Sequence, residues 1–559
     1  MRKKTEIAFR VSGHRVNIIV TLCLFGLCLV QVLPAQRNKQ KRQQSDRVEL
    51  LHADELRYDM YGPNPDAQIA KGHVAFRHQG GRLTCDSAYF YQEANSMKAF
   101  GHVFFTQGDT LSLKADRADY DGQEQVMRAR KNVVLKHRKQ TLYTDSLDYD
   151  RLYKNAYFFE GGTLVDGKDR LVSDWGEYNI ETRQAVFYYN VKLRSENRLV
   201  TTDTLHYDTQ KSLAHVLGPS TITTKTSTVE TTDAFFYSHS DQAQLFRRST
   251  IVDGQKTITG DSLYYDSKTG DSNGYGNVIF VDKANKSSLK ADYLQYNEKT
   301  GYGYATKRAV VIDYSQKDTL YMHADTLKLF TFNIDTDSVY RKIHAYKKVR
   351  AYRKDMQAVC DSLVFSTQDS CMTMYQDPIV WNGNRQLLGE TIRLLMNDST
   401  IREAHVIGQA LSVEKADTKE HYNQISSKAM HAYFERGEIR EAVAVSNVKS
   451  IFFPVDDQDS SLVMLNYLET DTMRMHFAPN RVLERIWMPK AVGTSYPMTQ
   501  IPADRSKLPS FAWFDEIRPM SKDDIFVWRG KGDDGGLKYE ARQEAPLQRL
   551  KRTAKENLQ

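Results

Sequence analysis

From about residue 50 to residue 480, apolar and polar residues alternate in the way that is typical of β-strands. The stretch LYTDSLDYD at 142–150 shows the pattern, with apolar side chains at every second position on each side of its first Asp. Apolar residues do not recur every three to four positions over this region, so helices are not expected there. The pattern predicts an all-β fold.

This phrase recurs along the chain with a period of about 29 to 31 residues, which loosens after residue 292. Each copy has an Asp, often a Leu two positions later, and nearly always an aromatic residue four positions later. The anchoring residues are Asp54, Asp86, Asp116, Asp145, Asp174, Asp203, Asp233, Asp261, Asp292, Asp325 and Asp361, and Glu390 continues the series. A fixed period of this length is typical of stacked repeats.

The positions of the apolar residues predict a bend at each Asp. Apolar or small residues lie three and one positions before the Asp, and two and four positions after it. Because side chains alternate between the two faces of a strand, the inward face must change at the Asp, as it does at a bulge. A short carboxylate can accept hydrogen bonds from N–H groups left unpaired there. A column of Asp residues that binds Ca²⁺ is the alternative interpretation.

A second phrase follows each Asp phrase by about 14 to 18 residues. It reads Gly-His-Val-Ala-Phe at 72–76 and Gly-Asn-Val-Ile-Phe at 276–280. Glycine suits a second bend with unusual backbone angles. Each repeat is then two long bent strands, or four short ones, around an apolar interior. One repeat buries too little apolar surface to offset the entropy lost on ordering about 30 residues. The predicted fold class is therefore an elongated β-jellyroll or solenoid-like stack of repeats.

The inward positions are the candidate binding residues, because they line any space that the strands enclose. They could form a dry core or an open apolar groove that suits acyl chains, and periodicity does not separate these two. The predicted lining residues are Leu56, Tyr58, Val74, Phe76, Val103, Phe105, Tyr120, Leu147, Tyr149, Leu205, Tyr207, Leu263, Tyr265, Val278, Phe280, Leu294 and Tyr296.

The two ends of the chain differ from the repeats. Five basic residues among the first 15 precede an apolar run from Val16 to Leu33, followed by Pro34 and Ala35. This order is typical of a signal peptide that is cleaved after Ala35, and an uncleaved membrane anchor is the alternative. The predicted segments are the signal at 1–35, a polar linker at 36–47, repeats in two or more units at 48–478, an irregular Pro- and Trp-containing segment at 479–528 and a disordered charged tail at 529–559.

Composition and motifs narrow the function. The net charge is +7, and much of the excess lies in the first 15 residues, so nucleic acid is not an expected partner. A match to G-x-S-x-G at 270–274 has no helix after it, and zinc-ligand and phosphate-loop motifs do not occur. We therefore expect no enzyme activity, no catalytic or metal-binding residues and no cofactor. Cys360 and Cys371 either form a disulfide or remain buried thiols.

The export signal and the repeated phrases together resemble the OstA-like family, which includes LptA, LptC and the N-terminal domain of LptD. The most similar phrases are GYGNVIFVD at 274–282 and LKADYLQYN at 289–297. The resemblance covers about residues 48 to 450. It implies a periplasmic β-jellyroll whose interior holds lipid acyl chains, and it brings no catalytic residues.

The resemblance also implies a role and partners. The role is a non-enzymatic lipid-binding bridge that carries lipopolysaccharide between the inner and outer membranes, for outer-membrane assembly. The implied partners are lipopolysaccharide or a related lipid, other bridge proteins joined by end-to-end strand pairing, an outer-membrane translocon and an inner-membrane complex. The implied location is the periplasm, or the inner membrane facing the periplasm if the N-terminal segment persists. An extracytoplasmic structural or adhesive repeat protein with a dry core is the alternative function.

Overall fold

The computed structural model describes residues 47–529, except for 239, 241, 335, 398, 399, 418, 457, 460, 480 and 481. Contacts divide the chain into residues 1–45 and residues 46–559, and the description below concerns the second unit. The predicted signal or anchor and almost all of the polar linker and the charged tail lie outside the described residues. In the part that is described, no helix is long and apolar enough to cross a membrane.

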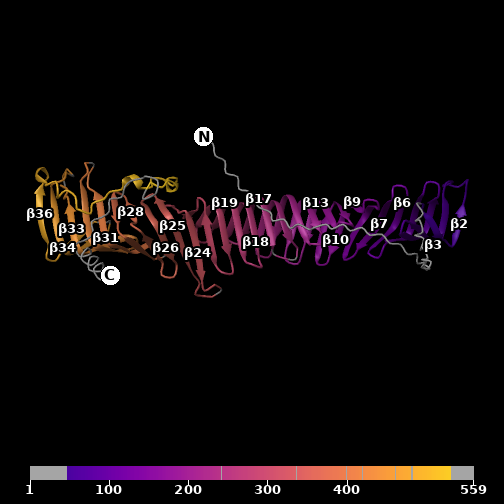
Figure 1. Ribbon diagram of the computed structural model, residues 1–559, viewed down its shortest axis with the longest axis horizontal. Coiled ribbons are helices and arrows are strands. Elements are labelled where there is room, and N and C mark those ends of the chain that lie inside the picture. The colour runs from indigo at the N-terminus through magenta and orange to yellow at the C-terminus, as the bar shows by residue number, and fades with distance from the viewer. Residues whose placement is uncertain are drawn as a thin grey trace, which may run out of the picture. The chain divides into compact units, whose positions relative to one another are not determined.

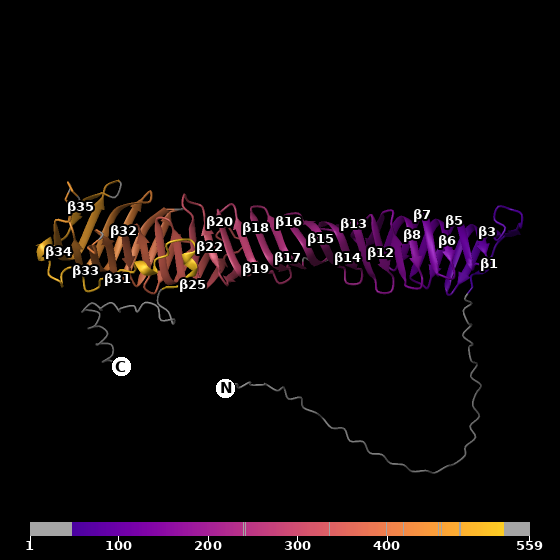
Figure 2. The same ribbon diagram turned by 90° about the horizontal axis from the view of Figure 1, so that it is seen from above.

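The described residues form one antiparallel sheet of 36 strands, most of which pair with their neighbours in sequence. Figures 1 and 2 show these strands following one another in chain order, from β1 and β2 at one end to β36 at the other. This arrangement confirms the predicted all-β stack of repeats. The structure also contains three short 3₁₀ helices near the end of the described chain.

The first half of the stack contains β1 (Glu49–His52), β2 (Glu55–Tyr58), β3 (Gln68–His78), β4 (Gly81–Tyr91), β5 (Ser96–Gln107), β6 (Leu111–Asp121), β7 (Val126–His137), β8 (Gln140–Asp150), β9 (Asn155–Phe158), β10 (Gly162–Asp166), β11 (Asp169–Ser173), β12 (Trp175–Asn179), β13 (Gln184–Arg194), β14 (Leu199–Asp208), β15 (Leu213–Thr223), β16 (Ser227–Tyr237), β17 (Gln242–Asp253) and β18 (Lys256–Asp266).

The second half contains β19 (Asp271–Asp282), β20 (Ser287–Asn297), β21 (Tyr302–Thr306), β22 (Val310–Asp313), β23 (Leu320–His323), β24 (Thr326–Phe332), β25 (Tyr340–Arg353), β26 (Met356–Ser366), β27 (Cys371–Tyr375), β28 (Ile379–Asn382), β29 (Arg385–Leu388), β30 (Thr391–Asn397), β31 (Thr400–Lys415), β32 (Tyr422–Glu435), β33 (Glu438–Phe452), β34 (Met464–Phe477), β35 (Leu483–Trp487), β36 (Val492–Pro497), η2 (Met498–Gln500), η3 (Asp515–Ile517) and η4 (Asp524–Phe526).

Each long strand bends once near its middle, and the bends fold the sheet into two arms. The pairing of β4 with β5 shows such a bend, because the register shifts between Thr84 and Ser87. Each long strand contributes one half to each arm. The halves in arm 1 are connected by turns such as 79–80 and 108–110, and the halves in arm 2 are connected by turns such as 92–95. We call the line of bends the corner. The opposite side, where the turns of the two arms lie, is the mouth.

Both repeated phrases lie at the corner, on alternate strands. On β5, Gly101 and His102 have φ angles of 74° and 44°, and His102 Nδ1 lies 2.8 Å from Asp86 Oδ2 on β4. A Cβ atom on Gly101 would overlap with the Asp86 carboxylate, so the close approach requires glycine here, and the left-handed backbone angle favours it. The second phrase therefore bends the next strand at the same corner as the first phrase.

The carboxylates at the corner are held mainly by side chains rather than by backbone. The expected bond from a backbone N–H occurs at Asp145, whose Oδ1 accepts a bond of 3.1 Å from Asn132. Side chains on the following strand pair with four more of the carboxylates: His73 with Asp54, Asn132 with Asp116, Asn190 with Asp174 and Asn277 with Asp261. This column of pairs fixes each strand's register relative to the next. In the described residues, no group of three or more His, Cys, Asp or Glu side chains could hold a metal ion.

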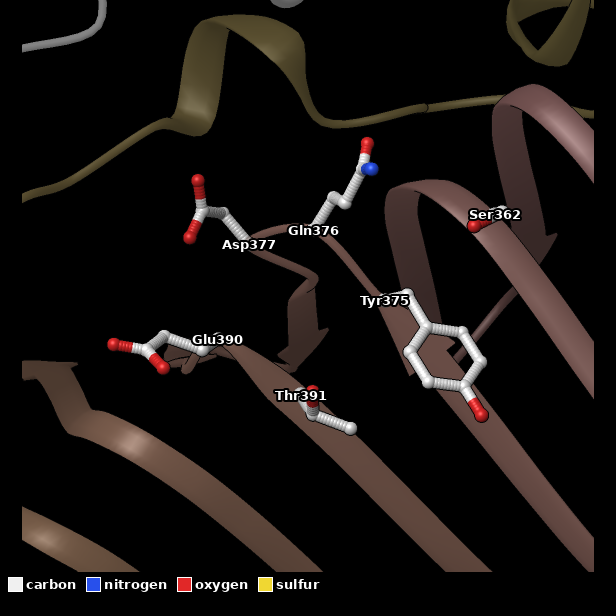
Figure 3. A pocket seen from close by; sticks show the side chains of 6 residues that line it. All are labelled: Ser362, Tyr375, Gln376, Asp377, Glu390 and Thr391. Carbon is white, nitrogen blue, oxygen red and sulfur yellow. The ribbon is translucent and has the colours of Figure 1, made fainter.

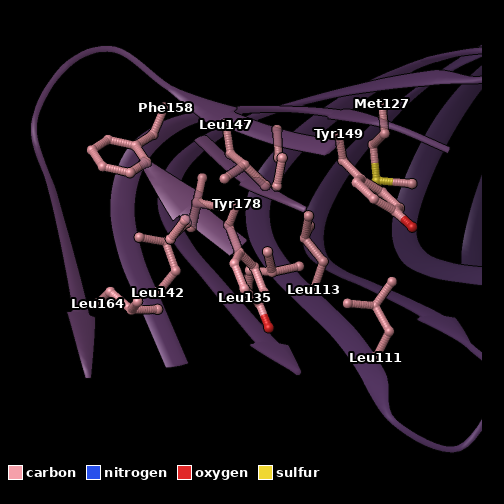
Figure 4. Close-up of a cluster of buried hydrophobic side chains, with 14 of the residues drawn as sticks. Leu111, Leu113, Met127, Leu135, Leu142, Leu147, Tyr149, Phe158, Leu164 and Tyr178 are labelled. Atoms are coloured by element: carbon pink, nitrogen blue, oxygen red, sulfur yellow. The ribbon is translucent and has the colours of Figure 1, made fainter. Parts of the chain in front are cut away.

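The interior between the arms is apolar along most of the stack. One cluster of buried side chains extends from Val48 to Leu263, and a second extends from Ala291 to Ala410. Figure 4 shows part of the first cluster, where Leu135 and Leu142 lie near Tyr178, and Tyr149 lies near Met127. The two clusters differ in how far they are sealed from solvent, and this difference defines the candidate site.

Candidate functional site

From β3 to β15, which we call the closed sector, the interior is sealed. The predicted lining residues in this sector are all exposed by 3% or less: Val74, Phe76, Val103, Phe105, Tyr120, Leu147, Tyr149, Leu205 and Tyr207. A cavity beside Tyr120 and Arg151 measures about 10 Å³, which is at the lower limit of what a water molecule needs. The inward side chains of the closed sector therefore pack as an ordinary dry core.

Hydrogen bonds across the mouth join the two arms of the closed sector. In each of them a Tyr at the predicted inward position of arm 2 meets a polar side chain at the end of arm 1. The four pairs are His78 Nδ1 with Tyr120 OH at 2.7 Å, Tyr149 OH with Gln107 Oε1 at 3.3 Å, His137 Nδ1 with Tyr178 OH at 2.8 Å, and Tyr207 OH with Asp169 Oδ2 at 3.0 Å. We call these pairs the mouth latches.

Burial keeps the latch tyrosines protonated, so that they can donate hydrogen bonds. Burial raises the pKa of Tyr149 to about 12 and also raises that of Tyr207. Two arginines add to the closure. Arg151 donates to the phenol oxygen of Tyr120 and to the carbonyl of His78, the latter at 3.2 Å. At the other end of the sector, Arg198 Nη2 donates to the Ser240 carbonyl at 3.1 Å.

From β18 to β34, which we call the open sector, many inward side chains away from the corner are only half-buried, whereas those next to the corner are buried. Leu263, Val278 and Leu294 lie there and are exposed by 8% or less. The predicted lining residues nearer the mouth, Tyr265, Phe280 and Tyr296, are half-buried. Other apolar residues with half-buried side chains in this interior are Leu289, Val311, Ala351, Phe365, Met372, Leu387, Met430 and Phe434. The open sector thus presents an apolar inner surface that solvent partly reaches.

Two local features accompany this opening. In the open sector, Tyr296 pairs with Ser272 and Gly303 on the neighbouring strands. In the closed sector, Tyr120 pairs with Met97 and Met127. Less side-chain volume therefore fills the interior beside Tyr296. Further along the sector, thioether side chains are frequent, with Met322, Met374 and Met430 packed in or against the same cluster. Methionine is flexible and adapts its shape to what it contacts.

The structure does not bring every predicted lining residue into the interior. Leu56 and Tyr58, on β2, are exposed by 54% and 60%. Strand β2 has four residues and pairs with β3, so its side chains lie at the end of the stack rather than between two packed arms. Their exposure makes them candidates for contact with another strand rather than with a bound molecule.

The last described segment, residues 498–529, covers a surface that the sequence did not indicate. We call it the strap. Leu387 packs against the interior cluster, and its neighbour Leu388 packs in a separate cluster with Trp513 of the strap. Because neighbouring side chains point to opposite faces of a strand, the strap lies on the outer face of arm 1. Gln386, which is fully buried, accepts a hydrogen bond from the Phe514 amide and donates one to the Ala512 carbonyl, both at 2.8 Å.

Two further groups of residues bear on chemistry. A shallow pocket of about 710 Å³ lies at the corner, lined by Ser362, Tyr375, Gln376, Asp377, Glu390 and Thr391 (Figure 3). Here Gln376 and Asp377 take the left-handed backbone positions that Gly and His or Asn take elsewhere, so the pocket is a polar variant of the corner. Cys85, Cys360 and Cys371 are free and buried, so the disulfide that the sequence left open does not form.

Comparison with known proteins agrees with the repeat phrases. Residues 45–203 match the model of a family described as OstA-like protein. Among solved structures, LptH from Pseudomonas aeruginosa, described as the LptA-homologous periplasmic component of the conserved lipopolysaccharide transport device, is similar. The sequences are 14% identical, and the match covers 26% of this chain and 99% of LptH with a TM-score of 0.19. No curated protein matches the sequence.

Proposed function

Because residues 45–203 match the OstA-like family, we propose that the protein is a non-enzymatic periplasmic carrier of lipopolysaccharide or a related lipid between the inner and outer membranes. The observation that carries this proposal is the half-buried apolar inner surface of the open sector. Large contiguous apolar surfaces that solvent reaches often mark binding sites. An acyl chain that covered it would gain about 0.8 kcal/mol for each buried CH₂ group.

The shape of the open sector fits a lipid with a large polar head. The side chains next to the corner, such as Val278 and Ala291, are buried and make a closed floor. The side chains nearer the mouth, such as Phe280 and Leu289, remain half-buried. Acyl chains would lie on the floor between the arms, and a hydrated headgroup would stay outside the mouth in water. Flexible Met side chains would adjust to chains of different length.

The ends of the stack fit the proposed partners. The exposed Leu56 and Tyr58 side chains on β2 would be covered if a strand of another bridge protein paired at this end. At the other end, β36 pairs with β34 and carries the exposed Val492. Pairing at both ends would place the protein in a chain of proteins that reaches an inner-membrane complex and an outer-membrane translocon. The proposed location depends on the predicted export signal at residues 1–35.

A structural or adhesive repeat protein is the second candidate function, and the dry core of the closed sector favours it. A photo-crosslinking scan in cells that make lipopolysaccharide separates the two. Photoreactive residues would replace Phe280 and Phe365, which face the interior, and their neighbours Ile279 and Val364, which face outward on the same strands. We expect lipid adducts at the two inward sites only. Adducts at none of the four sites in a folded protein would favour the structural function.

A further inference from the structure

We propose that the mouth latches are a gate, so that lipid occupies the closed sector only when these hydrogen bonds open. This inference rests on the proposed function and concerns the regulation of the same interior. The latches recur with the period of the repeat, and each one joins side chains 38 to 42 residues apart in sequence. They lie at the mouth, where a molecule between the arms would have to enter or leave sideways.

The interior behind the latches has the same apolar character as the open sector. Leu113 and Leu142 in the closed sector lie three residues before their corner Asp, and so do Ile258 and Leu289 in the open sector. The first two are exposed by 2% or less, and the last two are half-buried. The inward side chains at this position are apolar in both sectors, but the sectors differ in how the mouth is joined and, beside Tyr296, in how much side-chain volume fills the interior.

In the open sector, the Tyr at the same position of the repeat bonds along its own arm. Tyr265 is the counterpart of Tyr149, but its hydroxyl donates to Glu298 Oε1 on the same arm, at 3.3 Å. Thr224, at the end of arm 1 and 41 residues before Tyr265, bonds to Ser227 in its own turn at 2.8 Å. The apolar side chains near this Tyr, such as Ile258 and Phe280, are half-buried.

The corner allows the arms to separate without breaking the strand ladders. At each corner the register shifts, as it does between Phe100 and Val103 on β5, and residues in the left-handed conformation interrupt the backbone pairing. A small change at this line would widen the mouth while both arms keep their hydrogen bonds. The latches hold the arms together on the other side. A single neutral hydrogen bond contributes modestly to stability, so one latch can open while its neighbours stay closed.

Lipid moving along the interior would then open one latch at a time, and the latch behind it would close again. Closure removes the empty interior from water, so the closed sector would not expose apolar surface between passages of lipid. The gate thus explains why tyrosine, rather than phenylalanine, occupies these buried positions, because phenylalanine would fill the core equally well but would not bond across the mouth.

The test compares variants that remove latches with a variant that changes an outward tyrosine. Tyr149→Phe combined with Tyr178→Phe removes two latch bonds and keeps both rings, and Tyr143→Phe on the outer face of β8 is the matched control. A photoreactive residue at Leu142 reports lipid in the closed sector, and one at Phe280 reports lipid in the open sector. We expect the double variant to raise adducts at Leu142 on the order of tenfold, with Phe280 unchanged and the control without effect.

Three outcomes would overturn the gate. Adducts at Phe280 with unchanged adducts at Leu142 in the double variant would leave the lipid-carrying function intact and refute the gate. Equal labelling at Leu142 and Phe280 in the unmodified protein would show that closed latches do not exclude lipid. Adducts at neither site in any variant would refute the proposed function, and the gate with it.

A locked variant tests the gate in the opposite direction. His137→Cys and Tyr178→Cys, joined across the mouth by a bifunctional thiol reagent, would prevent this latch position from opening. With the five native cysteines replaced by Ala, the introduced pair would be the thiols that the reagent joins. We expect the crosslink to abolish adducts at Leu142 and to leave those at Phe280 unchanged. Persistent labelling at Leu142 in the locked protein would overturn the gate.

Discussion

Gly101→Ala tests the corner, on which both sectors depend. Gly101 has a φ of 74°, and a methyl group there would overlap with the Asp86 carboxylate. Gly108 is the matched control, because its φ is 61° and a methyl group there would meet nothing within 4 Å. Both substitutions place alanine in the left-handed conformation, which costs about 1–2 kcal/mol. Only Gly101→Ala must also displace Asp86 and break its contact with His102.

The expected result is a difference between the two alanine variants that depends on Asp86. Gly108→Ala should lower the local free energy of opening by about 1–2 kcal/mol. Gly101→Ala should lower it further, and in an Asp86→Ala background its effect should fall to that of Gly108→Ala. The coupling energy between positions 86 and 101 should exceed about 0.5 kcal/mol, beyond what independent sites show.

Hydrogen exchange measured on peptides from β4 to β6 is the suitable assay, because a repeat array opens locally rather than in one transition. Slowly exchanging amides near Ser87 and Val103 report opening at this corner. If Gly101→Ala and Gly108→Ala have equal effects, or if the Asp86→Ala background leaves the effect of Gly101→Ala unchanged, the close approach of the carboxylate does not constrain the corner and our explanation of the repeated glycine is wrong.

Three further predictions concern the strap and the histidines. Gln386→Ala should weaken docking of the strap by about 2–3 kcal/mol, because it removes two hydrogen bonds to the strap backbone, including the one to Ala512. Faster hydrogen exchange in residues 505–520 would report this weakening. Burial lowers the pKa of His137, so the contribution of neutral His137 to stability is complete above about pH 6.5 and decreases as the pH falls below this value. The protection of β7 against hydrogen exchange should therefore decrease from pH 7 to pH 5. The hydrogen bond to Asp54 raises the pKa of His73, and NMR titration should show that Asp54→Asn returns this pKa toward its ordinary value.

The regular part of the fold was predictable because local alternation determines it. The period and the change of inward face at each Asp predicted the bent strands. The partner of each Asp was not predictable, because it lies on the next strand and depends on register. The alignment also failed where the local pattern was ambiguous. At Asp233 the bend comes one residue earlier, at Thr232, since Ala234 and Phe236 are buried while Tyr237 is exposed by 40%.

The division into closed and open sectors had no signal within one repeat. Tyr149 and Tyr265 belong to nearly identical phrases, yet one bonds across the mouth and the other bonds along its own arm. The difference depends on the residue about 41 positions earlier, Gln107 in one case and Thr224 in the other, and only the register brings that residue to the mouth. A search for polar residues at this offset from each inward Tyr would have found the latches.

The corner and the mouth therefore have separate tasks. The corner pairs, such as Asp86 with His102, recur in both sectors and fix how one strand follows the next, as Asp261 with Asn277 does in the open sector. The side chains at the mouth can differ between sectors, because changing them alters neither the strand register nor the backbone hydrogen bonds between strands. A chain built in this way can join sectors with different interiors without a domain boundary. If lipid moves through both sectors, the free energy of each latch, rather than the fold, sets how easily it passes.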